Sequence, residues 1–205
     1  MKRVAIVDYG MCNLDSVRRA FEECSSAPFV TDEPTDLAAA DLIVLPGVGA
    51  FPDAMANLRD RALDKALDDE VLGNRVPFLG ICLGMQLLAT TGHEGGETPG
   101  LGWIDADVCR LRPTPEDPRV PHMGWNEVVP ARESPLFAGM PPAGDFYFVH
   151  SYHVACHDNT DVVATTPYCG GFVSAIQRDN ILAVQFHPEK SQERGFEVLR
   201  RFLAL

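Results

Sequence analysis

Short apolar runs alternate with amphipathic stretches in the first half of the chain. Residues 3–8, 41–45 and 76–81 are compact apolar runs with the length and composition of buried strands. Between them, apolar side chains recur at helical spacing in two segments: Leu14, Val17 and Phe21 in the first, and Met55, Leu58, Ala62 and Ala66 in the second. The alternation predicts a mainly parallel central sheet with helices on both faces.

The pattern changes near residue 100. Short alternating runs, punctuated by Gly and Pro, occupy residues 104–111, 124–129, 146–150, 162–166, 172–177 and 181–186. They predict a smaller antiparallel or mixed sheet in the C-terminal half. A final helix is predicted over 191–204, with Ser191 as its N-cap and Phe196, Leu199 and Leu203 on one face. Since there is no internal repeat and no long linker, we expect one α/β domain spanning residues 1–205.

Composition narrows the functional classes. The chain has 205 residues, 46% of them apolar and 22% charged, which is typical of a globular domain. Its net charge of −12 has the wrong sign for binding nucleic acid or anionic lipid. No run approaches the roughly 18 apolar residues of a membrane span, and the apolar run after Met1-Lys2-Arg3 is too short for a signal sequence. The six cysteines are scattered without a Cys-x-x-Cys pair, so we expect a cytoplasmic protein.

The residues Gly80-Ile81-Cys82-Leu83-Gly84 join the apolar run 76–81 to a predicted helix. The glycines relieve crowding at a tight strand-to-helix turn and leave Cys82 exposed at the carboxyl edge of the sheet, where open α/β sheets bind ligands. A sulfur at a helix N-terminus lies near the positive end of the helix dipole, which favours the thiolate. Taken alone, the pattern fits a catalytic nucleophile and a buried structural cysteine equally well.

A candidate base stands at the end of another apolar run, 181–186. His187 ends this run, and Glu189 follows two residues later. Glu189 would orient the imidazole of His187 and stabilise its charge, which is the role of the third member in catalytic triads. A His-Pro-Glu sequence by itself is more often ordinary loop chemistry, so the prediction of a base depends on its pairing with Cys82.

A glycine-rich turn, Pro46-Gly47-Val48-Gly49, follows the apolar run 41–45. It is a weak candidate for a phosphate-binding loop, because no Lys or Ser/Thr follows it in the required place. Exposed amides suit an oxyanion hole better, so we expect the N–H groups of Val48 and Gly49 to join that of Leu83.

Together these motifs resemble the triad-type, class I glutamine amidotransferases. The resemblance rests on Gly-Ile-Cys-Leu-Gly-Met-Gln at 80–86 and Phe-His-Pro-Glu at 186–189. It implies a flavodoxin-like α/β fold and a catalytic triad of Cys82, His187 and Glu189. It also implies hydrolysis of glutamine to glutamate and ammonia without a cofactor.

Further blocks are similar to the glutaminase subunits of imidazole glycerol phosphate synthase, an enzyme of histidine biosynthesis. They lie at residues 8–11, 46–51, 122–126, 148–152 and 185–191, from end to end of the chain. In those enzymes the ammonia passes to a (βα)8-barrel cyclase subunit, which makes imidazole glycerol phosphate and aminoimidazole carboxamide ribotide. No segment of this chain resembles a synthase domain, so the resemblance implies such a heterodimer partner. The alternatives are a glutaminase serving another ammonia-using synthase and a non-catalytic interaction subunit.

The resemblance also implies residues for substrate and partner. The glutamine-binding positions correspond to Gly49, Gln86 and Glu94, with backbone contacts from Ser151 and Tyr152. Gln86 stands one helical turn after Cys82 and so shares its face of the helix, while an exposed loop carboxylate is the alternative for Glu94. The interface positions correspond to Asn13, Trp125, Tyr147 and Lys190. A core position for Trp125 and a solvated charge for Lys190 are the alternatives.

Two features stand apart from the resemblance. Cys12 occupies a position where the family usually has Gly, so either the turn accepts a side chain there or the chain enters this loop differently. His150, His153 and His157 suggest zinc at first sight, but no Cys or carboxylate partner is suitably spaced. On a strand, His150 and His153 would also face opposite sides. We expect no metal site.

Overall fold

The computed structural model describes residues 1–141 and 143–205. Within them, a nine-stranded sheet runs in the order β2-β1-β3-β4-β13-β12-β11-β8-β9, and a four-stranded sheet in the order β10-β7-β5-β6. The strands of the large sheet are β1 (Arg3–Val7), β2 (Ala27–Thr31), β3 (Leu42–Leu45), β4 (Phe78–Ile81), β8 (His122–Pro130), β9 (Gly144–His150), β11 (Val162–Thr166), β12 (Phe172–Arg178) and β13 (Ile181–Val184). Those of the small sheet are β5 (Ala89–Gly92), β6 (Thr98–Pro99), β7 (Ile104–Arg110) and β10 (Tyr152–Cys156).

The first five strands of the large sheet, from β2 to β13, are parallel, which confirms the predicted mainly parallel centre. Every residue of β3, β4 and β13 is buried, because helices cover both faces of this part of the sheet. The four remaining strands are antiparallel and extend the same sheet. The later half of the chain therefore widens the central sheet, and it contributes only part of the smaller one.

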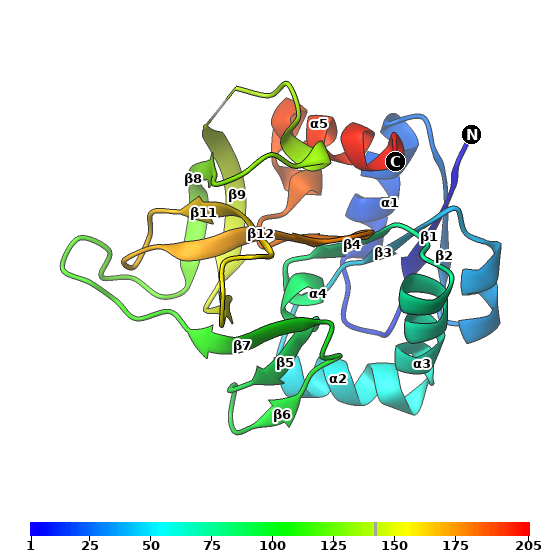
Figure 1. Cartoon of the computed structure of the whole chain (residues 1–205), viewed down its shortest axis with the longest axis horizontal. Helices are drawn as coiled ribbons and strands as arrows, with labels where there is room; N and C mark the ends of the chain where they lie inside the picture. The colour runs from blue at the N-terminus through cyan, green and yellow to red at the C-terminus, as the bar shows by residue number, and fades with distance from the viewer. Residues whose placement is uncertain (142) are drawn as a thin grey trace.

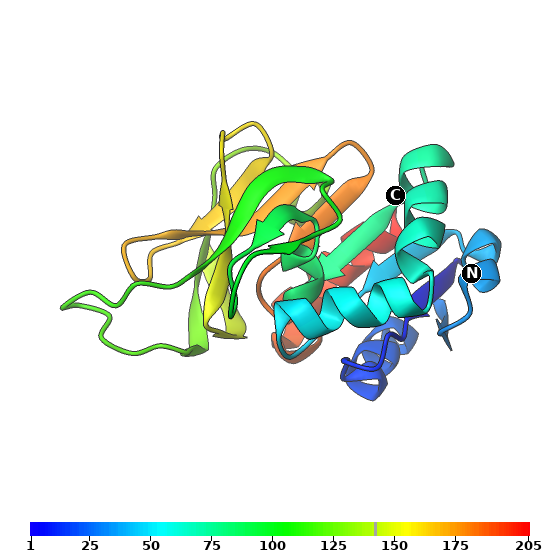
Figure 2. The same cartoon turned by 90° about the horizontal axis from the view of Figure 1, so that it is seen from below.

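Helices lie on both faces of the parallel strands, with α1 and α5 on one side and α2 and α3 on the other (Figure 1). Their bounds are α1 (Leu14–Glu23), α2 (Phe51–Asp60), α3 (Leu63–Leu67), α4 (Leu83–Gln86) and α5 (Gln192–Leu203). Short turns of other helical type are η1 (Pro34–Ala39), η2 (Asp68–Gly73), η3 (Pro135–Phe137) and η4 (Pro188–Lys190). Each face has its own buried core, one beneath α1 and α5 and the other beneath α2, α3 and the small sheet. The antiparallel strands lie at the end away from the two termini (Figure 2).

The helix predicted around residues 55–66 is interrupted. Ala62 adopts a left-handed conformation, with φ of 56°, between α2 and α3. The interruption resets the helical phase, so that Leu63 and Leu67 point into the core while Ala62 is exposed. The free energy gained by burying these two leucine side chains exceeds the cost of interrupting the helix.

The closing helix is confirmed as α5, and Ser191 stands at its N-cap position, but the Ser191 side chain makes no capping hydrogen bond. Its hydroxyl donates to the carbonyl oxygen of His187 at 2.6 Å and accepts the N–H of Tyr147 at 3.0 Å. Of the predicted face, Leu199 is buried, whereas Phe196 and Leu203 are only partly buried at its rim. Along residues 1–141 and 143–205, we find no helix with the length and apolar character needed to cross a membrane.

Candidate active site

Three adjacent strands of the parallel region end at the same edge of the sheet. β4 lies between β3 and β13, with Leu45 opposite Gly80 and Ile81 opposite Val184. The segments that follow these strands therefore meet: the turn Pro46–Gly49, the residue Cys82, and the stretch from Gln185 to Glu189. This is the edge where parallel sheets of this type bind their ligands.

Cys82 stands on a strained turn between β4 and α4. Its φ and ψ of 54° and −108° lie outside the ordinary regions for a side-chain-bearing residue. Gly84 makes the turn possible, because a Cβ there would lie 1.8 Å from the carbonyl oxygen of Leu45. The side chain is only 5% exposed and reaches solvent through a pocket, so the predicted open exposure of Cys82 is wrong. The helix after it is a single turn, which weakens the predicted effect of a helix dipole.

His187 and Glu189 form a buried pair. His187 Nδ1 lies 2.8 Å from Glu189 Oε1, and both side chains are at most 3% exposed. Burial alone would lower the pKa of His187, but the neighbouring Cys82 sulfur and the Glu189 carboxylate outweigh it and raise that pKa from 6.5 to about 10. The environment therefore favours the protonated, imidazolium form of His187. Within the described residues, His187 Nε2 is buried without a hydrogen-bond partner, which leaves this nitrogen free to exchange a proton with a reacting group.

The elements around His187 hold it firmly. Its backbone N–H donates to the carbonyl oxygen of Tyr147 at 2.9 Å, and its own carbonyl oxygen accepts the Ser191 hydroxyl. These bonds tie the turn η4 to strand β9, so the imidazole is positioned by two parts of the fold that are far apart in sequence.

A pocket of about 330 Å³ opens beside Cys82. It is lined by Cys82, Val149, His150 and all the residues predicted for the oxyanion hole and for glutamine: Val48, Gly49, Leu83, Gln86, Glu94, Ser151 and Tyr152. Its volume suits a small polar metabolite. The buried side chains of His187 and Glu189 are not among its lining residues.

Two lining residues have defined partners. Gln86 Nε2 donates to the carbonyl oxygen of Tyr152 at 2.8 Å, and Glu94 Oε2 accepts the N–H of Phe51 at 2.8 Å. Phe51 begins α2, so the Glu94 carboxylate also stabilises the helix end that follows the glycine-rich turn. Glu94 is therefore a structural as well as a pocket residue.

The glycine-rich turn holds one of the predicted oxyanion donors away from the pocket. The N–H of Val48 donates to the carbonyl oxygen of Met11 at 2.8 Å. An N–H committed to this bond is not available to an oxyanion, so the prediction for Val48 does not describe this conformation. Gly49 has a φ of 116°, which only glycine adopts readily.

Three of the predicted interface residues gather on one surface. Trp125 and Tyr147 are paired across β8 and β9, with ring centroids 6.1 Å apart, and Lys190 Nζ lies 5.9 Å from the Tyr147 ring centroid. Trp125 is 47% exposed, so the core alternative for it is wrong. Asn13 is exposed at the start of α1, a helix that contacts η4.

Cys12 is accommodated by the turn that contains it. Gly10, and not Cys12, takes the left-handed conformation in this turn, with φ of 87°. The Cys12 thiol donates to the carbonyl oxygen of Pro46 at 3.3 Å, and burial raises its pKa to about 12. It is a neutral hydrogen-bond donor that links its loop to the glycine-rich turn.

The three histidines considered for zinc have separate partners. His150 contacts the His122 ring. His157 contacts the carboxylates of Asp105 and Asp107. The ring of His153 contacts the backbone of its own strand. The part of the chain that the structure describes holds no cluster of three or more His, Cys, Asp or Glu side chains suited to a metal ion.

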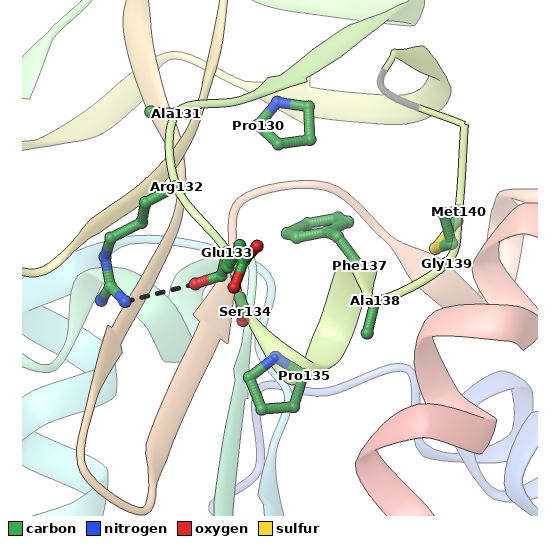
Figure 3. A pocket seen from close by; sticks show the side chains of 10 residues that line it. All are labelled: Pro130, Ala131, Arg132, Glu133, Ser134, Pro135, Phe137, Ala138, Gly139 and Met140. Carbon is green, nitrogen blue, oxygen red and sulfur yellow. Dashed lines mark hydrogen bonds between the residues drawn. The ribbon is translucent and has the colours of Figure 1, made fainter.

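A larger pocket of about 730 Å³ lies in the loop after β8. Figure 3 shows its wall, formed mainly by Pro, Ala, Gly and Phe137, with Arg132 donating to the backbone of Glu133. Among the described residues, no histidine or cysteine lines it, and the Ser134 hydroxyl accepts the N–H of Leu136 at 3.4 Å, so it is not the candidate active site.

Sequence reasoning missed two groups beside the pocket. Gln185 is fully buried and contacts Cys82, and its position two residues before His187, in the apolar run predicted as a strand, was the available signal. The second group is the buried pair His122 and His150, whose ring nitrogens lie 3.0 Å apart.

The family model described as Glutamine amidotransferase class-I matches residues 5–204. The imidazole glycerol phosphate synthase subunit HisH of Moorella thermoacetica is 50% identical over 202 residues, which cover 98% of this chain and 94% of the relative. The subunit HisH 1 of Campylobacter jejuni is 45% identical over 204 residues, with coverage of 98% and 100%. The HisH of Salinibacter ruber is 47% identical over 204 residues, with coverage of 98% and 93%.

Solved structures share the fold at lower identity. A protein from Thermoplasma acidophilum, described as a putative component of GMP synthase, has a TM-score of 0.76 at 22% identity, covering 100% of this chain and 93% of that one. A glutamine amidotransferase has a TM-score of 0.77 at 17% identity, with coverage of 98% and 97%. The predicted fold class is confirmed.

Proposed function

Because this chain belongs to the class-I glutamine amidotransferase family, we propose that it hydrolyses glutamine to glutamate and ammonia with Cys82, His187 and Glu189. The observation that carries the proposal is the meeting of these residues at one sheet edge, beside a pocket of about 330 Å³. The strained turn at Cys82 supports it further, since such strain is characteristic of nucleophile elbows.

The proposed reaction begins when the Cys82 thiolate attacks the side-chain carbonyl carbon of glutamine. The carbonyl oxygen takes the displaced electron pair, and backbone N–H groups stabilise it. His187 gives its proton to the leaving nitrogen, the carbon–nitrogen bond breaks, and a glutamyl thioester remains. Water, activated by His187 as base, then cleaves the thioester and releases glutamate and the thiolate. Glu189 holds the ring of His187 through both steps.

The oxyanion donors are the N–H groups of Leu83, Gly49 and Val48. The Val48 peptide must first exchange its bond to the Met11 carbonyl for one to the oxyanion. Until it does, the reaction lacks a donor of the kind whose loss typically costs roughly 10²–10³ in rate. The chain is therefore proposed to be slow on its own and fast when this peptide has turned.

Glutamine itself is held by the pocket wall. Gly49, Gln86 and Glu94, with the backbone of Ser151 and Tyr152, are proposed as its binding residues. Glu94 supplies the negative charge that an α-ammonium group requires, and its bond to Phe51 keeps that carboxylate in place.

We further propose that the chain is the glutaminase subunit of an imidazole glycerol phosphate synthase. This rests on the full-length relatives that carry that name, at 45–50% identity. The partner is a (βα)8-barrel cyclase that receives the ammonia. Asn13, Trp125, Tyr147 and Lys190 are the proposed contact residues, and the exposed Trp125–Tyr147 pair has the aromatic character of interface anchors.

The test is a glutaminase assay of the chain alone and with the cyclase and its ribotide substrate. We expect glutamate release to rise at least about 100-fold in the full mixture, as expected when an oxyanion donor is gained. Equal turnover by the isolated chain would contradict the coupling to the partner. If another ammonia-using synthase raised glutamate release by the chain more than the cyclase does, the assignment to this synthase would be contradicted.

A variant tests the triad separately. Cys82→Ala should abolish synthesis from glutamine while added ammonium salts still support the cyclase. Cys24→Ala is the matched control, because that thiol lies at the end of α1 and contacts the carbonyl of Phe196. Loss of both glutamine- and ammonium-dependent synthesis in Cys82→Ala would assign Cys82 to docking or structure.

A further inference from the structure

Gln185 is a fully buried polar residue beside the proposed nucleophile. It follows β13 directly, and the N–H of Cys82 donates to the carbonyl oxygen of the preceding residue, Val184, at 2.8 Å. This register brings the Gln185 side chain to the sulfur: its terminal Nε2 lies 3.6 Å from Cys82 Sγ. The triad mechanism uses no such contact.

The hydrogen-bond chain decides which end of the Gln185 amide faces the sulfur. The carbonyl oxygen of Tyr152 can only accept, so the atom of Gln86 that lies 2.8 Å from it is the NH₂ group. The same NH₂ lies 3.0 Å from the Gln185 side chain, which must present its oxygen there. The remaining terminal atom of Gln185, the one that faces Cys82, is therefore a nitrogen donor.

We infer that Gln185 is a further catalytic residue, which donates a side-chain N–H to Cys82 Sγ and stabilises the negative charge on the sulfur. The inference rests on the proposed function of Cys82 as nucleophile. A thiolate accepts such a bond strongly and a thiol only weakly, so the bond favours the reactive form.

The charge balance of the site explains the value of a neutral donor. The His187 ring lies 2.8 Å from the Glu189 carboxylate, and the neighbouring Cys82 sulfur also raises the pKa of His187. An N–H dipole adds stabilisation for the sulfur without adding a second cation that would need its own counter-charge. Low exposure strengthens such a bond, and Gln185 is 0% and Cys82 5% exposed.

The donor is also held in advance of the reaction. Gln185 is anchored at its oxygen by Gln86, and Gln86 is anchored in turn by the backbone of Tyr152 in the pocket wall. A donor fixed in this way need not reorganise when charge develops on the sulfur. It also links the nucleophile to the wall that is proposed to hold glutamine.

The competing interpretation is that Gln185 only connects β13 to α4 through its bond to Gln86. In that case, replacing it would change stability or the KM for glutamine. The pH dependence of the reactivity of Cys82 would not move, because the sulfur would have the same electrostatic surroundings.

The experiment measures the rate of Cys82 alkylation by iodoacetamide as a function of pH, read by peptide mass spectrometry on the complete chain. Iodoacetamide needs no glutamine recognition, and the other five cysteines serve as internal references. Gln185→Leu and Gln185→Met both remove the donor. Ser174→Ala is the matched control, because Ser174 is buried on the adjoining strand β12 and its hydroxyl has no partner in the described part of the chain.

We expect both Gln185 variants to shift the alkylation profile to higher pH and to slow alkylation at pH 7 about tenfold, as expected for one lost hydrogen bond to a charged group. Ser174→Ala should keep the wild-type profile. A wild-type profile in whichever Gln185 variant folds would overturn the inference. A shifted profile in a chain that releases no glutamate, even with the cyclase, would support the Gln185 contact and contradict the proposed function.

Discussion

Gly47 lies in the glycine-rich turn and packs closely against two side chains, those of Tyr9 and Leu83. A Cβ on Gly47 would lie 1.9 Å from the Tyr9 hydroxyl oxygen and 3.0 Å from Leu83 Cβ. An ordinary contact is about 3.5 Å, so Gly47→Ala requires Tyr9 to move by about 1.5 Å. Tyr9 is fully buried, which leaves no open space for that movement.

The magnitude follows from this displacement. Overpacking a buried site costs about 1–3 kcal/mol, and the depth of the overlap places Gly47→Ala at the upper end. For a chain of this size, a loss of about 3 kcal/mol lowers the Tm by roughly 6–12 °C. Glutaminase activity should fall further, by about 100-fold, because the overlap also displaces Leu83, the residue after the nucleophile.

Tyr9→Phe provides the decisive test. It removes the atom that the new Cβ meets, so the double variant Gly47→Ala/Tyr9→Phe should recover most of the lost Tm. The single variant Tyr9→Phe should be neutral or stabilising by up to about 1 kcal/mol, because the Tyr9 hydroxyl is buried and lacks a hydrogen-bond partner within residues 1–141 and 143–205. Thermal unfolding and the cyclase-coupled glutaminase assay measure both quantities.

Gly84→Ala is the control in which rescue is impossible. Its Cβ would lie 1.8 Å from the carbonyl oxygen of Leu45, which is backbone and cannot be trimmed by mutation. Tyr9→Phe should therefore leave Gly84→Ala as damaged as before. A Gly47→Ala variant with wild-type stability, or one that Tyr9→Phe fails to improve, would refute the steric reasoning.

Three other predictions concern pH, docking and an ion pair. Burial lowers the pKa of His122 to about 4 and that of His150 to about 3, so below pH 6.5 the unfolded chain binds more protons than the folded one. The free energy of unfolding should therefore decrease as the pH is lowered from 6.5 to 4. A free energy from urea unfolding that does not change over this range would contradict the prediction. Trp125→Ala should weaken binding to the cyclase about 30-fold in calorimetric titration, as for an aromatic anchor, with an unchanged Tm. Asp161→Asn should lower the free energy of unfolding by about 1 kcal/mol, a modest value because its partner Arg178 is 42% exposed, and added salt should shrink the difference.

The parallel half of the fold was predictable because its apolar runs are nearly unbroken. β3 and β4 are buried on both faces, and a strand of that kind contrasts clearly with the amphipathic helices around it. β2 and β10 were not predicted, since their residues are mostly half-buried and their pattern is mixed. The interruption at Ala62 was not predicted either. Ala62 and Ala66 have the same helical spacing as Leu63 and Leu67, so the sequence did not show that the leucines would be the buried pair.

The members of the proposed triad were predictable for a related reason. Cys82 directly follows β4 and His187 lies three residues after the end of β13, and parallel strands that are neighbours end at one edge. The pairing of β4 with β13, which are about a hundred residues apart in the chain, was not visible in either motif. Gln185 was missed because a Gln next to an apolar run is typical of the end of a strand. Only the structure shows that its side chain contacts Cys82.

The orientation of the Val48 peptide was not predictable from the sequence, for a different physical reason. Glycine stands on both sides of Val48, so the peptide can turn with little steric resistance. In the observed orientation the Val48 N–H donates to the Met11 carbonyl oxygen, and in the proposed reactive orientation it donates to the oxyanion. A sequence motif specifies which residues lie at this edge, but the choice between two acceptors is a balance of single hydrogen bonds, each worth about 1 kcal/mol net. A balance that small is one that a bound partner or substrate can shift, which is why the glycines of this turn matter to the proposed control of the reaction.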